Sequence, residues 1–252
     1  ADGPLGNLGT GATARGVAGL SLGTSGAVRT VVPEPYADPE GRLFSYALTA
    51  DAWVVGGAVS NGGAVVRWAG EMFASHIEPG ARRDTELLAL AEEAPPGCDG
   101  LVMRPYLLPE RAPLWDPQLR GAYVGLTHRH TRGHLVRAGV EGVALRLAEI
   151  VRDLDRVHPV GAVRITGGAF RSALWRRVVA AVVDRPTVFA SGAEGSALGA
   201  AALGLYALGR APSLDAAPVL LDPSTAEGEP VPVTDAEAAA YRDLRSRGWG
   251  TP

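Results

Sequence analysis

The sequence of 252 residues contains no lysine, and all 24 of its basic side chains are arginines. A P-loop requires a lysine that reaches the β- and γ-phosphates, and Schiff-base catalysis requires a lysine amine. The absence of lysine therefore excludes both mechanisms within this chain.

The sequence has a single cysteine, Cys98, so it has no internal disulfide. Cys98 lies between Gly97 and Asp99 in an expected loop, and no neighbour indicates a lowered thiol pKa. We therefore do not expect thiol catalysis. Because no signal peptide is visible either, we expect a reducing cytoplasmic location.

Long apolar runs and an excess of positive charge are also missing. No run approaches the roughly 18–20 apolar residues that a membrane span requires, and the formal net charge is −3, with acidic and basic residues interspersed. Proteins that bind nucleic acid usually carry a basic face. We therefore expect neither a membrane nor a nucleic acid as partner, and the 46% hydrophobic content predicts a sizeable core.

Periodicity divides the sequence into an early group of strands, one long helix and a later alternation of strands and helices. We expect a short helix at 2–12, strands at 17–22, 27–32 and 53–59, helices at 61–73 and 84–93, extended segments at 101–108 and 123–126, a helix at 131–154, strands at 162–165 and 187–190, and helices at 170–183, 194–208 and 235–247. The order βββαβαβα predicts an α/β protein with a mixed sheet flanked by helices. It matches the RNase H-like fold of the actin-like ATPases.

The longest predicted helix begins at Thr131, a good N-cap residue. Apolar residues follow it at spacings of three or four over about seven turns, which predicts a buried central helix. Residues 211–232 are rich in proline, alanine and aspartate without periodicity, so we expect a surface linker there.

Two glycine-rich segments are candidate ligand sites. Residues 22–26 (Leu-Gly-Thr-Ser-Gly) join two expected strands, and closely spaced backbone N–H groups with small side chains are what a phosphate requires. Residues 166–169 (Thr-Gly-Gly-Ala) follow a strand and precede a helix, where α/β proteins bind ligands. Taken alone, both segments also fit plain turns.

Together with their spacing, these segments resemble the C-terminal domain of the FGGY carbohydrate kinases. The resemblance rests on Ala-Asp-Gly at 1–3 with the segment at 21–26, on Leu-Pro-Glu-Arg-Ala-Pro-Leu-Trp-Asp at 108–116, on residues 121–126 with 134–141, and on residues 166–175 with 194–201. It covers roughly residues 1–208. Residues 60–68 and 109–115 look most like the gluconate kinases, and xylulose- or glycerol-type kinases are the alternative.

The resemblance implies a nucleotide-binding domain at 1–210, with a linker and C-terminal helix of the same domain at 211–252. It implies ATP and Mg²⁺ as cofactors and Asp2 as the general base that takes the proton of a sugar hydroxyl, with Asp2 meeting the metal only through Mg-ATP. By position alone, Asp2 also fits a helix N-cap. The residues implied to contact the nucleotide are Gly23, Thr24, Ser25, Gly63, Gly167, Gly168, Ala169 and Ser172.

The sequence departs from the family pattern at three positions. Arg67 stands where related glycerol kinases have glutamine, Ser172 replaces an asparagine, and Gly139 replaces a larger or hydroxyl residue. The first two departures put the corresponding nucleotide contacts in doubt.

Several charged residues have structural explanations that we favour over functional ones. We expect Glu110 and Arg111 to form a structural ion pair rather than a sugar site, and Glu141 to be a buried or interfacial structural acid. We expect Glu194 to favour the dipole of its helix. His128, His130 and His134 lack a further ligand nearby, so we do not expect zinc.

The resemblance also implies a missing partner. FGGY kinases close two RNase H-like lobes over a sugar or sugar acid and ATP, and this sequence begins where the N-terminal lobe should end. We expect an excised domain rather than a natural fragment, and little activity without the other lobe. Family members are often dimers, so a homodimer is compatible with the resemblance. A non-catalytic nucleotide-binding or regulatory domain is the alternative from another class.

Overall fold

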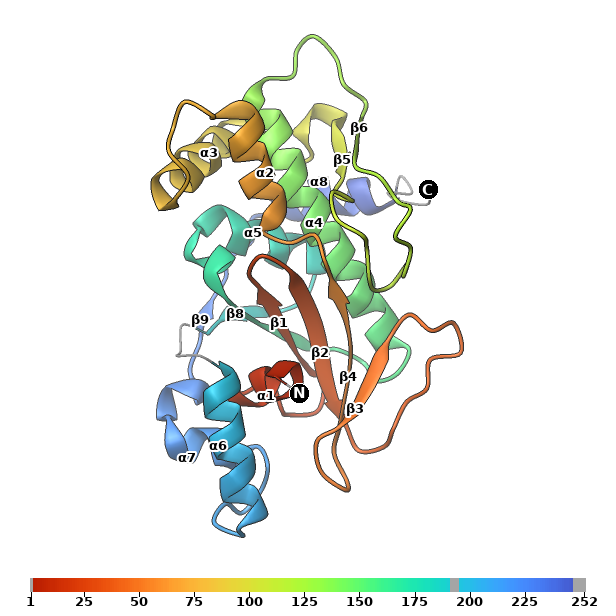
Figure 1. Cartoon of the computed structure of the whole chain (residues 1–252), viewed down its shortest axis with the longest axis vertical. Helices are drawn as coiled ribbons and strands as arrows, with labels where there is room; N and C mark the ends of the chain where they lie inside the picture. The colour runs from red at the N-terminus through yellow and green to blue at the C-terminus, as the bar shows by residue number, and fades with distance from the viewer. Residues whose placement is uncertain (1, 191–194, 247–252) are drawn as a thin grey trace.

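A computed structural model describes residues 2–190 and 195–246 and shows helices on both faces of a twisted mixed sheet (Figure 1). Within these residues, seven strands form the main sheet in the order β3–β4–β2–β1–β7–β8–β9. The strands are β1 (Val17–Leu22), β2 (Gly26–Val32), β3 (Phe44–Ala47), β4 (Trp53–Val59), β7 (Ala162–Thr166), β8 (Thr187–Phe189) and β9 (Glu229–Pro230).

The topology has the expected order with additions at both edges of the sheet. β1 and β2 form the predicted hairpin, while β1–β7 and β7–β8 pair in parallel. β3 and β9 were not predicted, and both pair antiparallel at the edges of the sheet. The predicted mixed α/β architecture is therefore confirmed, with two short edge strands more than the periodicity indicated.

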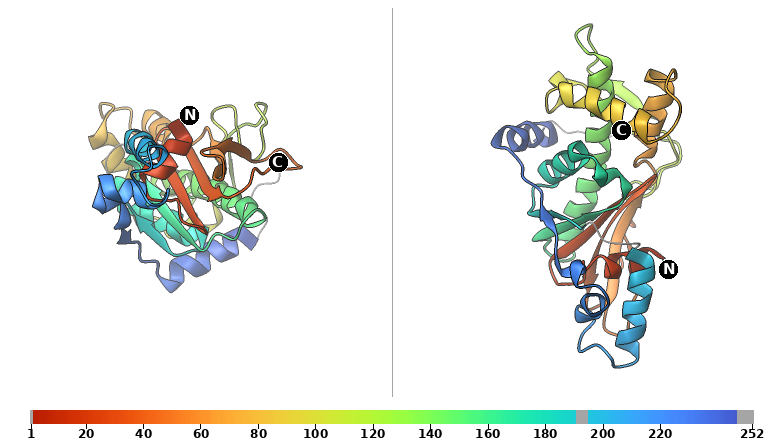
Figure 2. Two further views of the ribbon diagram at one scale, coloured as in Figure 1. Left: turned by 90° about the horizontal axis from the view of Figure 1, so that it is seen from below. Right: turned by 90° about the vertical axis from the view of Figure 1, so that its left-hand side faces the viewer.

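The helices form two layers and an end group. The helices are α1 (Asp2–Gly9), α2 (Ala64–Phe73), α3 (Ala81–Glu93), α4 (Arg132–Asp155), α5 (Ala173–Val183), α6 (Gly195–Ala207), α7 (Ala216–Leu221) and α8 (Asp235–Ser246). α4 and α5 cover one face of the sheet, and α8 packs outside α5. α1 and α6 cover the other face, while α2 and α3 lie at the opposite end of the molecule from α6 and α7 (Figure 2).

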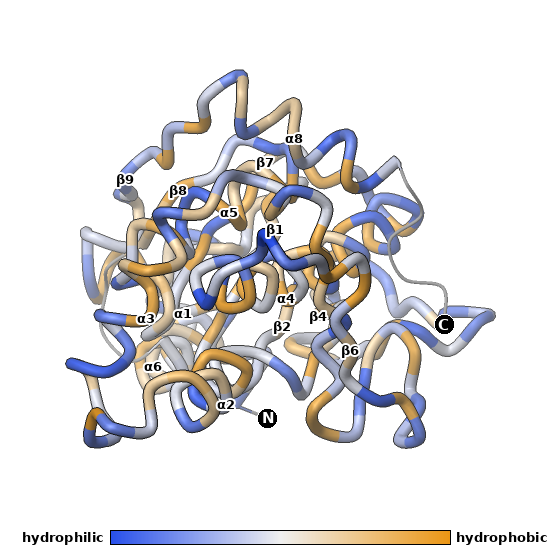
Figure 3. The backbone as a smooth tube through the Cα atoms, turned by 90° about the horizontal axis from the view of Figure 1, so that it is seen from above, coloured by the Kyte–Doolittle hydropathy of each residue, from blue (hydrophilic) through white to orange (hydrophobic). Residues whose placement is uncertain are grey.

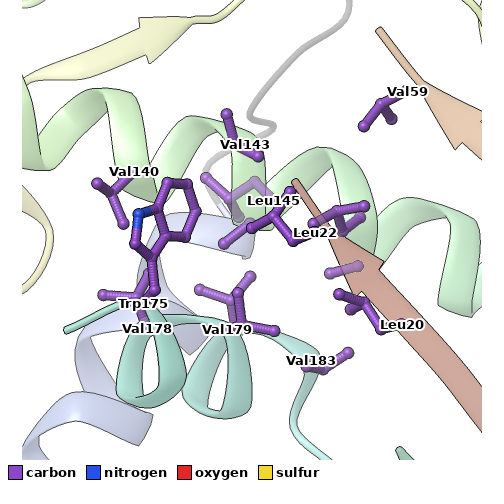
Figure 4. Packing of buried hydrophobic residues seen from close by; sticks show 14 of the residues in the cluster. Leu20, Leu22, Val59, Val140, Val143, Leu145, Trp175, Val178, Val179 and Val183 are labelled. Atoms are coloured by element: carbon purple, nitrogen blue, oxygen red, sulfur yellow. The ribbon is translucent and has the colours of Figure 1, made fainter. Parts of the chain in front are cut away.

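The main core lies between the sheet and the layer of α4 and α5. Leu20 and Leu22 of β1 face Val143 of α4 and Val179 of α5, and the indole of Trp175 fills the space between the two helices (Figure 4). Each large apolar side chain buried in this way contributes roughly 1.5–3 kcal/mol. Figure 3 shows the same division along the chain, with apolar segments inside and polar loops outside.

The predicted central helix is confirmed as α4, and its start is fixed by a capping box. The Thr131 side chain accepts the backbone N–H of His134, and the His134 ring accepts the backbone N–H of Thr131. Histidine thus takes the place that Glu or Gln usually fills in this arrangement. His134 therefore has a structural role, as does His130, whose Nδ1 accepts the N–H of Thr127.

The loop between α3 and α4 forms a small second sheet from β5 (Val102–Arg104) and β6 (Ala122–Val124), which packs on α4. These strands confirm the two extended segments that the sequence predicted. The segment 211–232 differs from the expected surface linker, because it contains α7, a 3₁₀ turn (Pro223–Ala226) and β9. The boundary at residue 210 remains a prediction.

The expected ion pair between Glu110 and Arg111 is wrong. Glu110 is buried, and its carboxylate accepts the backbone N–H of Ser60 and the side-chain amide of Asn61. The Arg111 guanidinium instead donates to the Val59 carbonyl and the Ser60 hydroxyl. The Arg111 backbone N–H also donates to Glu110 Oε1 at 2.9 Å, so both residues hold the loop to the end of β4 without an ion pair between their side chains.

The expectation for Glu141 is confirmed. Its buried carboxylate accepts bonds from Arg137 Nε at 2.8 Å, the Tyr241 hydroxyl at 2.8 Å and the Gly97 N–H at 3.1 Å. Burial raises the pKa of Glu141, and burial followed by the adjacent Glu141 carboxylate raises the pKa of the Cys98 thiol. A thiol in this environment is inert. Glu194 lies outside the described residues.

Candidate functional site

The structure brings six of the predicted nucleotide contacts to the rim of one pocket with a volume of about 630 Å³. These residues are Gly23, Thr24, Gly63, Gly168, Ala169 and Ser172. They come from the tip of the β1–β2 hairpin, the start of α2 and the turn after β7, and the hairpin tip lies beside α2 and α5 in Figure 1. Segments more than 140 residues apart in the sequence therefore form a single concave surface.

The hairpin tip is held in place by the start of α2. The N–H groups of Gly62 and Ala64 donate to the Thr24 carbonyl, and the N–H of Gly63 donates to the Gly23 carbonyl at 2.8 Å. These bonds occupy the first N–H groups of α2, which would otherwise attract an anion. The Thr24 hydroxyl accepts a bond from Arg67 Nη2 at 3.4 Å, so an arginine side chain lies beside the predicted phosphate contact.

Gly63 and Gly167 are glycines for reasons of close packing. A Cβ on Gly63 would lie 2.7 Å from the Gly23 carbonyl oxygen, so this residue lets α2 approach the hairpin. Gly167 has a φ of +109°, and a Cβ there would collide with the carbonyl oxygen of Leu22. Gly167 does not line the pocket, but it fixes the turn that places Gly168 in the pocket lining.

Gly23 and Gly168 differ from those two residues. Neither has a positive φ, and a Cβ built on either would meet no protein atom within 4 Å. Neither backbone conformation nor packing within the chain therefore requires glycine at these positions. Both residues line the pocket, so the missing side chains leave open space where a ligand could lie against the backbone.

The remaining predicted residues lie elsewhere or have a second role. Ser25 is exposed at the hairpin tip and is not part of the pocket lining. Ser172 lines the pocket and also caps α5, because its Oγ accepts the N–H of Trp175. Ser25 therefore lies outside the pocket, whereas Ser172 lies in its lining and also stabilises the start of α5.

The α3 wall of the pocket was missed by the sequence analysis. Asp84, Thr85, Leu88 and Glu92 line the pocket from this helix. No local motif marks them, since they reach the site only through the packing of α3 on α4 and α2. Arg67 was recognised only as a departure, although its place one helical turn after Gly63 puts it on the same face of α2.

Asp2 lies in a separate, smaller pocket of about 220 Å³ at the start of α1. Its side chain is exposed, and Oδ1 accepts the N–H of Gly3 at 2.8 Å. Ser21, Arg29, Thr166 and Ser196 also line this pocket. β1 contributes to both sites. Its C-terminal end leads into the hairpin tip at the larger pocket, and its residue Ser21 lines the smaller pocket together with Asp2.

Among the described residues, no cluster of three or more His, Cys, Asp or Glu side chains is arranged to hold a metal ion. No described helix is long and apolar enough to cross a membrane.

The mixed sheet with helices on both faces defines a lobe of the actin-like type. Residues 18–208 match the model of the C-terminal domain of the FGGY family of carbohydrate kinases, and the chain belongs to this family. The similarity predicted from the motifs at 21–26 and 166–175 is thereby confirmed.

Individual relatives agree with this assignment. The chain is 41% identical to a gluconokinase from Bacillus subtilis (strain 168) over 250 residues, which are 96% of this chain and 48% of that protein. It is 32% identical to a xylulose kinase from Escherichia coli (strain K12) over 80% of this chain and 41% of that protein. A gluconate kinase from Lactobacillus acidophilus superposes with a TM-score of 0.84 at 31% identity, covering 97% of this chain and 48% of the other. The chain thus spans about half the length of the relatives it matches.

Proposed function

We propose that this chain is the nucleotide-binding lobe, with the catalytic base, of an ATP-dependent kinase that phosphorylates a hydroxyl of a sugar acid. The observation that carries the proposal is the pair of open glycines, Gly23 and Gly168, on one pocket of a chain from this kinase family. Space at both positions suits a nucleotide lying against the backbone, with the phosphates toward Gly23 and the nucleoside toward Gly168.

The residues of the larger pocket fit ATP. The Thr24 hydroxyl and the Arg67 guanidinium would bind phosphate oxygens, and arginine suits this role because its planar donors match phosphate geometry. ATP would supply the phosphoryl group, and Mg²⁺ would neutralise charge on it. Because Mg²⁺ usually keeps several waters and binds through phosphates with one or two carboxylates, the absence of a side-chain cluster in the described part of the chain fits a metal that arrives with the nucleotide.

Asp2 would accept the proton of the acceptor hydroxyl at its carboxylate. Oδ1 accepts the Gly3 N–H, and the exposed carboxylate is accessible to an incoming substrate. A base of this kind typically contributes about 10²–10⁴-fold to the rate. The hydroxyls of Ser21 and Thr166 in the same pocket would orient the acceptor.

Gluconate is the acceptor that we favour. The gluconokinase relative is 41% identical, whereas the xylulose kinase relative is 32% identical over a smaller part of the chain. A xylulose- or glycerol-type acceptor is the alternative. The N-terminal lobe, which the relatives of twice the length indicate, would complete the acceptor site.

Calorimetric titration of Mg-ATP into the purified chain, with NAD as a control ligand, tests the nucleotide site. We expect Gly168→Leu to abolish selective ATP binding without lowering the melting temperature, because a side chain there enters open pocket space without backbone strain. Gly204→Leu is the matched control, since Gly204 also has nothing within 4 Å of its Cβ position but lies on α6 away from the pocket. Equal ATP affinity in the two variants would contradict the proposed site.

A further inference from the structure

Arg29 on β2 lines the same pocket as Asp2. It pairs across the sheet with Gly19 of β1 and Gly56 of β4. A Cβ on Gly56 would lie 2.9 Å from Cγ of Arg29, and a Cβ on Gly3 would lie 2.8 Å from its Nη2. Gly3, which directly follows Asp2, therefore makes room for the guanidinium of Arg29. Gly56 is instead required first by the Val28 carbonyl oxygen, with which a Cβ there would collide.

The charge of Arg29 is poorly compensated. Its Nη1 donates to the Ser21 hydroxyl at a long 3.3 Å, and its buried Nε has no hydrogen-bond partner. Among the ion pairs of residues 2–190 and 195–246, none within 4.0 Å includes Arg29. Leaving a buried polar atom without a partner is unfavourable, and a ligand that bonds to Arg29 would remove this cost.

Charged groups of both signs act on Arg29. Burial lowers the pKa of Arg29, the carboxylate of Asp2 acts in the opposite direction, and the Arg111 guanidinium adds to the lowering. Asp2 is the carboxylate next to Arg29, and in the proposed function this carboxylate must remain available for proton transfer. Among the described residues that line this pocket, Asp2 is the one carboxylate and Arg29 the one guanidinium.

We propose that Arg29 binds the carboxylate of the sugar-acid acceptor and makes this lobe a determinant of acceptor specificity. The inference rests on the proposed function and adds a substrate contact to it. The pocket of about 220 Å³ offers hydroxyl groups of Ser21, Thr166 and Ser196 next to the guanidinium of Arg29. A polyhydroxylated carboxylic acid matches that combination of one cation and several hydroxyls.

The carboxylate is a better match for Arg29 than the phosphoryl group. The predicted phosphate contacts lie in the other pocket, at the hairpin tip, where Arg67 already provides a cation. Arg29 lies three residues after Gly26, where β2 begins. It lines the pocket of Asp2 and not the pocket at the hairpin tip. The two arginines thus divide two anions between two pockets, one for the nucleotide and one for the acceptor.

The test compares D-gluconate with D-gluconamide, its neutral amide, in the two-lobed kinase that contains this chain. In the unaltered enzyme we expect kcat/KM to favour gluconate strongly. Arg29→Leu should reduce that preference by about 30- to 100-fold, the loss expected for a charge-assisted hydrogen bond, mainly through KM for gluconate. Arg29→Lys should keep part of the preference because it keeps the charge.

Controls separate this role from others. Arg129→Leu removes an exposed arginine from a loop outside both pockets and should leave the preference unchanged. Titration with Mg-ATP and the melting temperature verify that each variant is folded. An equal loss with gluconate and gluconamide would show that Arg29 acts on Asp2 or on the phosphoryl group, and an unchanged preference would show no contact; either result overturns the inference. If the unaltered enzyme turns over neither compound, the proposed acceptor class fails and this inference fails with it.

Discussion

At the level of the single residue, Asp2 fits two roles, one in the helix α1 and one in the smaller pocket. It is the first residue of α1, where a carboxylate interacts favourably with the helix dipole, and it is also the only carboxylate lining the smaller pocket within the described residues. A residue that served only the helix would not need Arg29 packed against the following glycine. The pocket therefore favours a chemical role over a capping role.

Exchange of Asp2 for asparagine in the two-lobed kinase separates these roles. We expect kcat to fall by about 10²–10⁴-fold, because the amide cannot accept the hydroxyl proton. Binding of Mg-ATP, measured by calorimetry, should be unchanged because Asp2 does not line the nucleotide pocket. A variant that keeps its turnover but loses stability would show that Asp2 serves only α1.

The glycines show how far a motif can be interpreted residue by residue. The sequence grouped Gly167 and Gly168 as one feature, yet the first is required by its φ of +109° and the second is not. That distinction depends on Leu22, which lies far away in the sequence and beneath the turn. A motif locates a site, but only the tertiary packing shows which of its residues face a ligand.

At the level of elements, α8 is attached to α4 by a buried polar network. The Tyr241 hydroxyl donates to Glu141, and Arg137 Nη2 donates to the same hydroxyl at 3.0 Å. Arg137 also donates to the Ala94 carbonyl at 2.9 Å, at the end of α3. Three helices therefore share one fully bonded cluster, in which each partner depends on the others.

Exchange of Tyr241 for phenylalanine should destabilise the lobe by about 1–3 kcal/mol, because Arg137 and Glu141 each lose a buried hydrogen-bond partner. Urea unfolding monitored by circular dichroism measures the change. Tyr206→Phe is the control, since no hydrogen bond of the Tyr206 hydroxyl is found among the described residues, and it should change stability by less than about 0.5 kcal/mol. Equal stability of the two variants would mean that the network contributes nothing net.

The elements that the sequence predicted share a strong local signal. β1, β2 and β4 are apolar runs bounded by glycine or polar turns, and α4 has seven turns of apolar spacing with a cap. β3 was missed because its four residues lie half-exposed at the sheet edge without alternation. α7 was missed because Pro218 and repeated alanines hide its periodicity, and its place is set by packing against α6.

The candidate site was predictable to a similar extent. Glycine motifs marked the hairpin and the turn after β7, since both need special backbone geometry or close approach. The α3 wall and Arg29 carry no local signal, because they reach their pockets through helix packing and strand register. Long-range register is the information that a single sequence lacks.

For the whole molecule, the two pockets define what this lobe can do by itself. It holds the predicted nucleotide contacts and the base, whereas the relatives are about twice as long. Both pockets open to solvent at the surface of the lobe, so an acceptor would be neither enclosed nor oriented from its second side. Enclosure and orientation supply much of the rate of such reactions.

We therefore expect the chain by itself to form ADP in response to gluconate at well below about one per second, under the typical range of enzyme turnover. A coupled assay of ADP release measures this, with the two-lobed kinase as the reference. Turnover near one per second by the isolated chain would contradict the need for a second lobe and would place the complete acceptor site within these residues.

The network between α4 and α8 also has a consequence for the order of events during synthesis. Tyr241 is separated from Glu141 by 100 residues, and a ribosome that adds about 5–20 residues per second takes roughly 5–20 s to reach it. During that interval Arg137 and Glu141 of α4 lack the hydroxyl with which both form hydrogen bonds. The core of the nascent lobe is thus complete only after α8 has been synthesised, because Tyr241 and Leu244 belong to it.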